Sequence, residues 1–600
     1  MRGVKLIVAV AVTMLAATAT ASAACDLTIS NGPQAGITEG PTGTFTSTAD
    51  SAVLDVGTLN DRLSVGNANV NVGTVPCLQS GNLTVSNAVS WSSGNSLTMF
   101  GTAAGSINAP ITSTNGSAGF TINVSQGITE SAGGTIGVAG LTSVQSGLSS
   151  ISLTSAGNDF GQLTVPGAPG GLLLTDANGI TLAGVNTSSG NLVLSAGAGV
   201  GQSAALNING STMITAGGPV SLNASNTFTG AVSVTNALAP VTLNAGGDLN
   251  LGAISASSLG ATAGDELLDV GNKTVTGATT LTAPTSITID TNANQLQGPV
   301  SATTNGVLTL RNDASTILGP VTSDGADIFS EGAVSQTGGI ADTGFFEVQG
   351  DTGVTLTNAS NDFDDLGVAS GGAATVRDAN SVNLRAVEAG AATVTAGNDL
   401  IVPDESTFFT AGAMTLVSDA NAGSALGPGG IDIAGDRAIT STGAPVRLYT
   451  AQRNQNSISP LATLNGATFT PGPEFVDSAT EVWNTVFPVG TATNPFTIFY
   501  KQAAPPPVDP PTPDTTLTKT PKKKTKTKKG KKKAKVSFEF TSSVAGSTFE
   551  CSLDGNASAC TSPFSKKLKK GKHAFSVAAS AAGKTDATPA TFSFKVKLKR

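Results

Sequence analysis

Apolar and polar residues alternate in short runs along the stretch from Ser152 to Leu251. Most runs pair aliphatic residues with Ser, Thr or Asn and end at Gly, Asn or Asp, which is typical of half-buried strands joined by tight turns. A recurring unit, an aliphatic residue, then Ser, Thr or Asn, then Ala-Gly, ends at Gly197, Gly217 and Gly246. Coils of roughly 20 to 30 residues are expected of solenoids, so this spacing predicts a parallel β-helix.

A longer duplication indicates that this stretch samples one regular lattice. The N-D-F sequence at residues 158–160 returns at residues 361–363, and a weaker copy, N-T-F, lies at residues 226–228. These segments resemble the beta strand repeats of bacterial surface proteins. Copies in the same phase this far apart predict one continuous solenoid.

The preceding part of the chain carries a second resemblance. The sequence W-S-S-G-N-S-L-T at residues 91–98 and I-N-A-P-I at residues 107–111 resemble the repeats of filamentous-haemagglutinin-type large exoproteins. That resemblance implies a right-handed parallel β-helix and says little about function, because one fold serves many functions. We therefore expect an all-β protein, with a right-handed parallel β-helix (solenoid) followed by a small β-sandwich.

Composition supports a solenoid, and charge divides the chain. Charged residues make up 12% and aromatic residues 4% of the sequence, which is little material for an ordinary globular core but enough for stacked strands. Residues 25–500 hold 8 Lys and Arg against 34 Asp and Glu, whereas residues 501–600 hold 22 against 6. A basic tail on a long acidic part points to a polyanionic partner for the tail.

The first 23 residues have the form of a secretory signal peptide. Arg2 and Lys5 precede an apolar run at residues 6–17, and an A-S-A cleavage sequence occupies residues 21–23. Cys25 raises the alternative of a lipoprotein anchor, which the serine three positions before it disfavours. No other run reaches the roughly 18 apolar residues of a membrane helix. We expect a secreted, extracellular protein that associates with the cell surface and has no transmembrane segment.

The four cysteines favour disulfides, as expected of an exported chain. Of three possible connectivities, the local one is the most economical, and it pairs Cys25 with Cys77 and Cys551 with Cys560. A C-x-x-C spacing and a histidine cluster are both missing from the sequence. We therefore predict no metal site and no cofactor.

Composition shifts divide the chain into five predicted parts. They are the signal peptide 1–23, a β-helical rod 24–464, a C-terminal cap of the rod 465–502, a linker 503–535 and a terminal domain 536–600. Aromatic residues concentrate in the predicted cap, where a sugar-stacking patch is the alternative interpretation. The linker is first proline-rich and then lysine-rich, and we expect it to be disordered because like charges repel.

The terminal domain carries a third resemblance. Residues 547–564 resemble the short immunoglobulin-like or fibronectin-III-like repeats on large extracellular proteins of soil actinobacteria. Their sequence is S-T-F-E-C-S-L-D-G-N-A-S-A-C-T-S-P-F. Flanking segments such as V-S-F-E-F and T-F-S-F-K-V alternate as strands do. The resemblance implies a small β-sandwich.

The lysine-rich tract is the candidate binding site for cell-envelope polyanions or polysaccharide. Its basic residues are Lys522, Lys523, Lys524, Lys526, Lys528, Lys529, Lys531, Lys532, Lys533 and Lys535. Such a tract attracts polyanions in a salt-dependent way. Aromatic residues are not interleaved with the lysines, so sequence-specific nucleic-acid recognition is not indicated. The plainer alternative is a solvated spacer that repels itself.

These features lead to one expected function and one alternative. The leading hypothesis is a secreted, non-enzymatic surface or matrix protein, an adhesin-like rod that its basic end tethers to envelope polyanions. The alternative is a carbohydrate-active β-helix enzyme, a polysaccharide lyase or glycoside hydrolase, that uses Asp362, Asp364 and Asp365 near one turn. Lyase chemistry would also want a basic residue beside the carboxylates, and Arg377 and Arg385 follow soon after. Ordinary turn-forming aspartates are the favoured interpretation of the cluster.

Overall fold

The computed structural model describes residues 25–72, 80–236, 239–404 and 510–599, together with short segments between residues 406 and 500. The chain divides into two compact units, Met1–Ala503 and Ala504–Arg600. The predicted signal peptide lies outside the described residues. In the part that the structure describes, no helix has the length and apolar character needed to cross a membrane.

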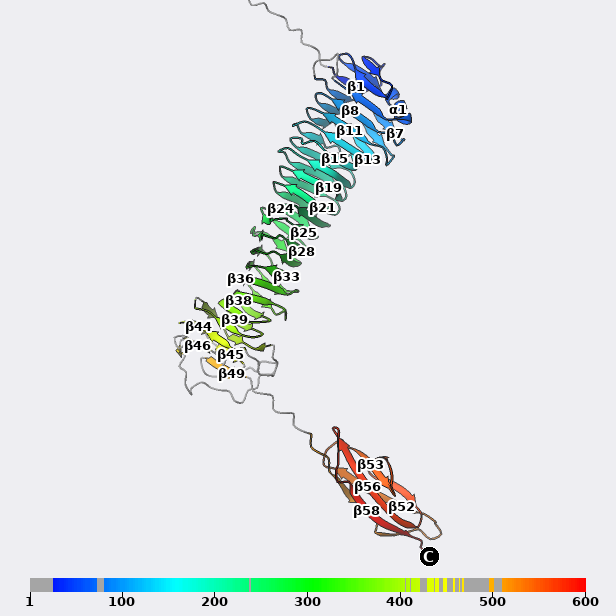
Figure 1. Ribbon diagram of the computed structural model, residues 1–600, viewed down its shortest axis with the longest axis vertical. Coiled ribbons are helices and arrows are strands. Elements are labelled where there is room, and N and C mark those ends of the chain that lie inside the picture. The colour runs from blue at the N-terminus through cyan, green and yellow to red at the C-terminus, as the bar shows by residue number, and fades with distance from the viewer. Residues whose placement is uncertain are drawn as a thin grey trace, which may run out of the picture. The chain divides into compact units, whose positions relative to one another are not determined.

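The first unit is a parallel β-helix, as the sequence predicts (Figure 1). Its regularity is clearest in β16 (Leu172–Asp176), β18 (Leu192–Ala196) and β20 (Thr212–Ala216). These strands pair in parallel, and Leu172 lies beside Leu192, which lies beside Thr212. A second stack of β17 (Ile180–Asn186) and β19 (Val200–Ile208) pairs in the same direction. Each coil in this region is therefore 20 residues long.

Alternating side chains and tightly stacked turns explain the coil. In β18, the side chains of Leu192, Leu194 and Ala196 are buried, and the residues between them face outward. A Cβ atom on Gly190 would lie 1.4 Å from the carbonyl oxygen of Gly170 in the previous coil. Only glycine allows the backbones of these two turns to approach so closely. The Ser152–Leu251 pattern thus encodes both the strands and their stacking.

One element at the N-terminal end was not predicted. Helix α1 (Val56–Val65) begins after Asp55, whose carboxylate accepts a 2.9 Å hydrogen bond from the Thr58 N–H. The helix buries Leu59 and Leu63 and lies at the N-terminal end of the stack (Figure 1), beside β4 (Ala52–Asp55) and β7 (Val89–Trp91). It provides apolar cover where a solenoid has an exposed first coil.

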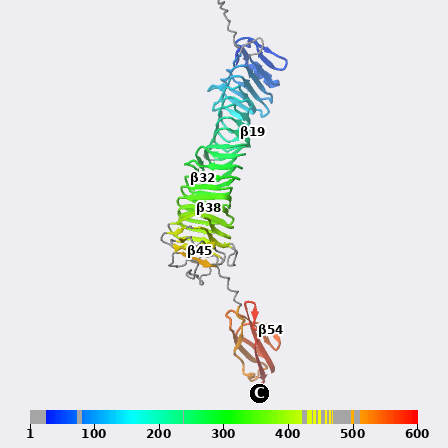
Figure 2. The same ribbon diagram turned by 60° about the vertical axis from the view of Figure 1, so that its left-hand side comes forward.

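The described strands near residue 500 extend the parallel ladder. Strand β49 (Phe496–Tyr500) pairs in parallel with β45 (Val446–Thr450), although it belongs to the segment predicted as a cap. Residues 469–495 of that segment lie outside the described residues, so the cap and the sugar-stacking patch stay predictions. The curved stack seen from another side in Figure 2 ends in this region.

The second unit consists of two sheets. The smaller has the order β50 (Thr515–Lys519), β52 (Ala534–Ser542), β55 (Phe564–Leu568). The larger has the order β51 (Lys524–Lys526), β58 (Ala590–Lys597), β56 (Gly571–Ala581), β53 (Thr548–Leu553), β54 (Asn556–Cys560), with β57 (Lys584–Thr585) beside β56. The ring of Phe538 in the smaller sheet stacks on Phe575 in the larger one at 3.9 Å. The two sheets therefore share one aromatic core, as in a small β-sandwich.

The disulfide predictions have different outcomes. Cys551 and Cys560 are bonded across β53 and β54 with their Cα atoms 5.7 Å apart, so this prediction is confirmed. Cys25 is also in a disulfide. Its predicted partner, Cys77, lies outside the described residues, so that pairing stays a prediction.

Candidate functional site

Four buried asparagines recur along the interior of the rod at intervals of 67 or 68 residues: Asn158, Asn226, Asn294 and Asn361. The Oδ1 atom of each accepts a hydrogen bond of 2.8 to 3.1 Å from a backbone N–H one coil earlier. The donors, in the same order, are Ile136, Leu206, Lys273 and Ile340. A buried N–H without a partner costs about 1 to 3 kcal/mol, so the asparagines stabilise the stack at these points.

A second polar residue accompanies each asparagine. Asn226 and Gln202 exchange two side-chain hydrogen bonds of 2.8 and 3.1 Å, and Asn361 and Gln336 exchange two of 2.8 and 2.9 Å. At the first position, Asn158 donates to Glu130 at 3.0 Å. The rod therefore repeats a polar pair that joins a buried asparagine to a partly buried partner.

Family comparison detects this repeat. Repeats of unknown function (DUF5649) match residues 170–235, 239–303 and 305–370. Each DUF5649 match contains one of the buried asparagines, so the polar pair marks the repeat. No curated protein and no solved structure matches the chain. The matches and the parallel stack together make this a β-helical repeat protein. The N-x-F copies at residues 158–160 and 226–228 are one repeat apart, and the copy at residues 361–363 follows two repeats later.

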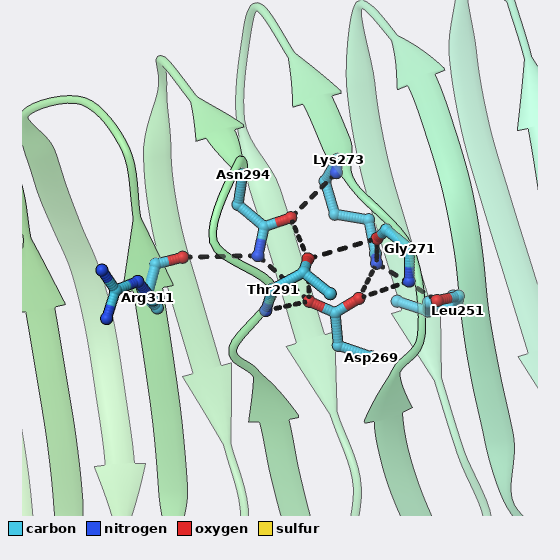
Figure 3. Close-up of polar contacts among 7 residues, drawn as sticks. All are labelled: Leu251, Asp269, Gly271, Lys273, Thr291, Asn294 and Arg311. Carbon is cyan, nitrogen blue, oxygen red and sulfur yellow. Dashed lines mark hydrogen bonds and ion pairs between the residues drawn. The ribbon is translucent and has the colours of Figure 1, made fainter.

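The second DUF5649 repeat differs from its neighbours at the polar pair. Figure 3 shows the polar contacts of Asp269, Lys273 and Asn294 in this repeat. Asp269 takes the place of the glutamine, and Lys273 takes the place of the aliphatic residue that donates its N–H. Both side chains are fully buried and form an ion pair. The second carboxylate oxygen of Asp269 accepts hydrogen bonds from the Thr291 hydroxyl at 2.8 Å and from Asn294 at 3.0 Å. An acidic and a basic residue thus stand in place of a glutamine and an aliphatic residue, while the asparagine is kept.

Hydrogen bonding favours the charged form of Asp269. Burial favours the neutral acid, but the hydrogen bonds from Lys273 and Asn294 outweigh it and lower the pKa of Asp269. Burial also lowers the pKa of Lys273, although the Asp269 carboxylate opposes this. Because neither side chain reaches solvent, the pair can hold two coils together but cannot meet a substrate.

The predicted acidic cluster lies on a strand and not at a turn. Asp362, Asp364 and Asp365 open β38 (Asp362–Arg377), because the chain is already extended after buried Asn361. Asp362 accepts a 3.0 Å hydrogen bond from Asn380, and Asp365 forms a 2.8 Å ion pair with Arg385. Arg385 thus does lie beside one of the predicted carboxylates.

A buried aspartate near this cluster was missed in the sequence. Asp378 is fully buried and accepts backbone hydrogen bonds from Phe363 at 2.7 Å and Asn380 at 2.6 Å. Burial, with a smaller contribution from the charges of Asp362 and Asp364, raises its pKa to about 6. The earlier N-D-F copy has the same arrangement at Asp176. The repeated contact indicates a structural aspartate that secures the turn.

The structure corrects the prediction that residues 519–535 are disordered. β51 (Lys524–Lys526) pairs in parallel with β58, and β52 begins at Ala534. The reason is the K-T-K-T alternation, which turns Thr525 and Thr527 inward and leaves the lysines outward. High lysine density hides a strand pattern here. The proline-rich residues 503–509 lie outside the described residues.

Strand pairing arranges three lysines in a straight row on the larger sheet. Lys524 of β51 lies beside Lys595 of β58, and Lys595 lies beside Lys572 of β56. All three are exposed on one face, and neighbouring strands are about 4.8 Å apart. Lys526 and Lys597 form a second pair two residues along the strands. The sheet fixes the spacing of these charges.

A shallow pocket of 540 Å³ adjoins this lysine row. It is lined by Lys523, Lys524, Asp554, Lys572, His573, Ala574, Ser593, Phe594 and Lys595. Ala574 and Ser593 are neighbours across β56 and β58, and their small side chains leave the space open. The pocket therefore combines several positive charges with a floor of small residues.

One carboxylate faces the pocket, and it is paired. Asp554 lies 2.6 Å from Nδ1 of His573, whose Nε2 lies 3.0 Å from the Lys569 carbonyl oxygen. Burial opposes the charged imidazole, but the hydrogen bonds to Asp554 and Lys569 outweigh it and raise the pKa of His573. Protonated His573 therefore neutralises Asp554 beside the lysines.

The ten predicted lysines are all exposed but do not act as one group. Lys523, Lys524 and Lys526 join the larger sheet, whereas Lys535 lies on the smaller sheet. Lys572, Lys595 and Lys597 were missed, although the alternation T-F-S-F-K-V-K placed two of them outward. In the described ranges, no three His, Cys, Asp or Glu side chains gather as a metal site requires.

Proposed function

We propose that this protein is a secreted, non-enzymatic, adhesin-like rod whose C-terminal unit tethers it to polyanions of the cell envelope. The row Lys524–Lys595–Lys572 carries the proposal. Because the sheet already holds these charges in place, binding a polyanion costs little ordering of the protein backbone. A flexible lysine tail would lack this advantage.

The charge of the rod supports the same division of roles. Residues 25–500 hold 34 acidic residues against 8 basic ones and repel a polyanion, whereas residues 501–600 hold 22 basic residues against 6 acidic ones. We therefore assign attachment to the second unit. The repeats form the rod that extends from this attachment point.

Retention on cells tests the tether. We expect the full-length protein to wash off in high salt, and a chain that ends at residue 503 to appear in the medium. Retention that resists salt, or that survives removal of residues 504–600, would contradict the proposal.

The alternative is a carbohydrate-active enzyme at the acidic strand. The ion pair of Asp365 with Arg385 favours this idea, since it sets a basic residue beside carboxylates. Incubation with pectic and other acidic polysaccharides would decide between them. New reducing or unsaturated ends that disappear in Asp364→Asn would overturn the non-enzymatic proposal, and unchanged polymers would support it.

A further inference from the structure

We infer that the lysine row and its pocket bind a linear acidic polysaccharide that carries about one carboxylate per sugar. This inference rests on the proposed function, because it names the polyanion that the C-terminal unit would hold. Three observations support it: the spacing of the lysines, the shape and lining of the pocket, and the types of residue that the face contains.

The spacing of the row fits one charge per sugar ring. Lys524, Lys595 and Lys572 stand on adjacent strands, so their backbones are about 4.8 Å apart. One hexuronate unit of an extended chain has about this length, so a chain laid across the strands would present one carboxylate to each lysine. Double-stranded DNA carries a charge every ~1.7 Å of its axis, which is much denser.

The pocket supplies room for the sugar between the charges. Its volume of 540 Å³ falls in the range of small-molecule sites. Ala574 and Ser593 lie on the same face as the lysine row and two residues from it. A sugar ring can therefore lie over these small side chains while its carboxylate reaches Lys572 or Lys595.

The residue types argue against a nucleic acid. Base stacking needs exposed aromatic rings, but Phe594, the aromatic residue of the pocket besides His573, is only 5% exposed. The lysines of the described pocket are point charges that pair with carboxylate and phosphate alike, so the choice of a carboxylated polymer rests on the spacing of the row and on the shielded ring of Phe594.

A matched pair of triple variants of the full-length chain tests the inference. K524Q/K572Q/K595Q removes the row, and K535Q/K566Q/K567Q removes the same charge from the smaller sheet. Binding to polygalacturonate would be compared with binding to polyphosphate and to single-stranded DNA at equal charge concentration. The secondary structure and the melting temperature of both variants would be checked first.

We expect the row variant to lose at least tenfold in affinity for polygalacturonate and the control variant to lose less than threefold. We also expect polygalacturonate to bind more tightly than the other two polymers. Equal losses in the two variants, or a preference for polyphosphate or DNA, would overturn this inference and leave the tether intact. Absence of binding to every polymer would contradict the tether itself.

Discussion

The rod and the C-terminal unit use the same strand geometry for opposite purposes. In the rod, the repeat brings polar residues inward, and buried Asn226 and Asn361 are each held by a partly buried glutamine. In the C-terminal unit, alternation sends charges outward, and Lys524 and Lys595 stand side by side in solvent. The comparison teaches that buried polar groups here secure the stack, whereas exposed ones are available to a ligand.

The largest expected effect comes from breaking the buried ion pair. Asp269→Asn leaves the Lys273 ammonium without its counterion in the core, which costs about 3 to 5 kcal/mol of unfolding free energy. The double variant D269Q/K273I recreates the pairs Gln202 with Leu206 and Gln336 with Ile340, so it should recover most of the loss. Urea unfolding followed by circular dichroism measures the stability of the single and the double variant. Equal destabilisation of these two variants would show that the repeats are not equivalent.

A smaller effect is expected from the pH dependence of Asp378. Its folded pKa of about 6 lies above the usual 3.8, so the fold favours the protonated acid. The contribution of this group to the free energy of unfolding should fall by up to about 3 kcal/mol as pH rises from 3.8 to 6. Above pH 6 this contribution should not change further.

Asp378→Asn should remove this pH-dependent contribution to stability, because asparagine does not titrate. The variant should keep the turn, since Asn312 accepts the equivalent backbone hydrogen bond from Leu296 in the neighbouring repeat. Exposed Asp327→Asn serves as the control. Unfolding curves measured across this pH range should separate the two variants. If the free energy of unfolding changes with pH as steeply in D378N as in the unmodified protein, the turn does not depend on this proton.

The smallest effect concerns the pocket. His573 faces Asp554, the Lys569 carbonyl and the Phe594 ring, with Lys572 and Lys595 on the adjoining positions. As pH rises through its raised pKa, His573 loses its charge and Asp554 becomes an uncompensated anion. Affinity for a polyanion should fall severalfold as pH rises above the ordinary histidine pKa of 6.5. His573→Gln should flatten this profile in binding titrations, and an unchanged profile would assign the pH dependence elsewhere.

The periodic sequence made the β-helical rod predictable. The lysine row depends on pairing between distant strands, which the sequence pattern does not reveal. Short alternating runs and the N-D-F copies were enough to predict a parallel β-helix, because each coil repeats a local pattern. Lys273 was overlooked although its strand, K-T-V, alternates and buries its first and third residues. The lysine row joins Lys595 to Lys572, 23 positions earlier, and to Lys524, 71 positions earlier, so only strand pairing could reveal it. The expected disorder of 519–535 was wrong because like charge was weighed above the K-T-K-T alternation.

The dependence of polyanion affinity on salt tests the central claim most directly. Binding of the full-length chain to polygalacturonate would be titrated at several salt concentrations, beside a chain that ends at residue 503. We predict a steep linear fall of the logarithm of affinity with the logarithm of salt for the full-length chain, and no measurable binding by the rod alone. Salt-independent binding, or equal binding by both chains, would contradict the assignment of attachment to the C-terminal unit.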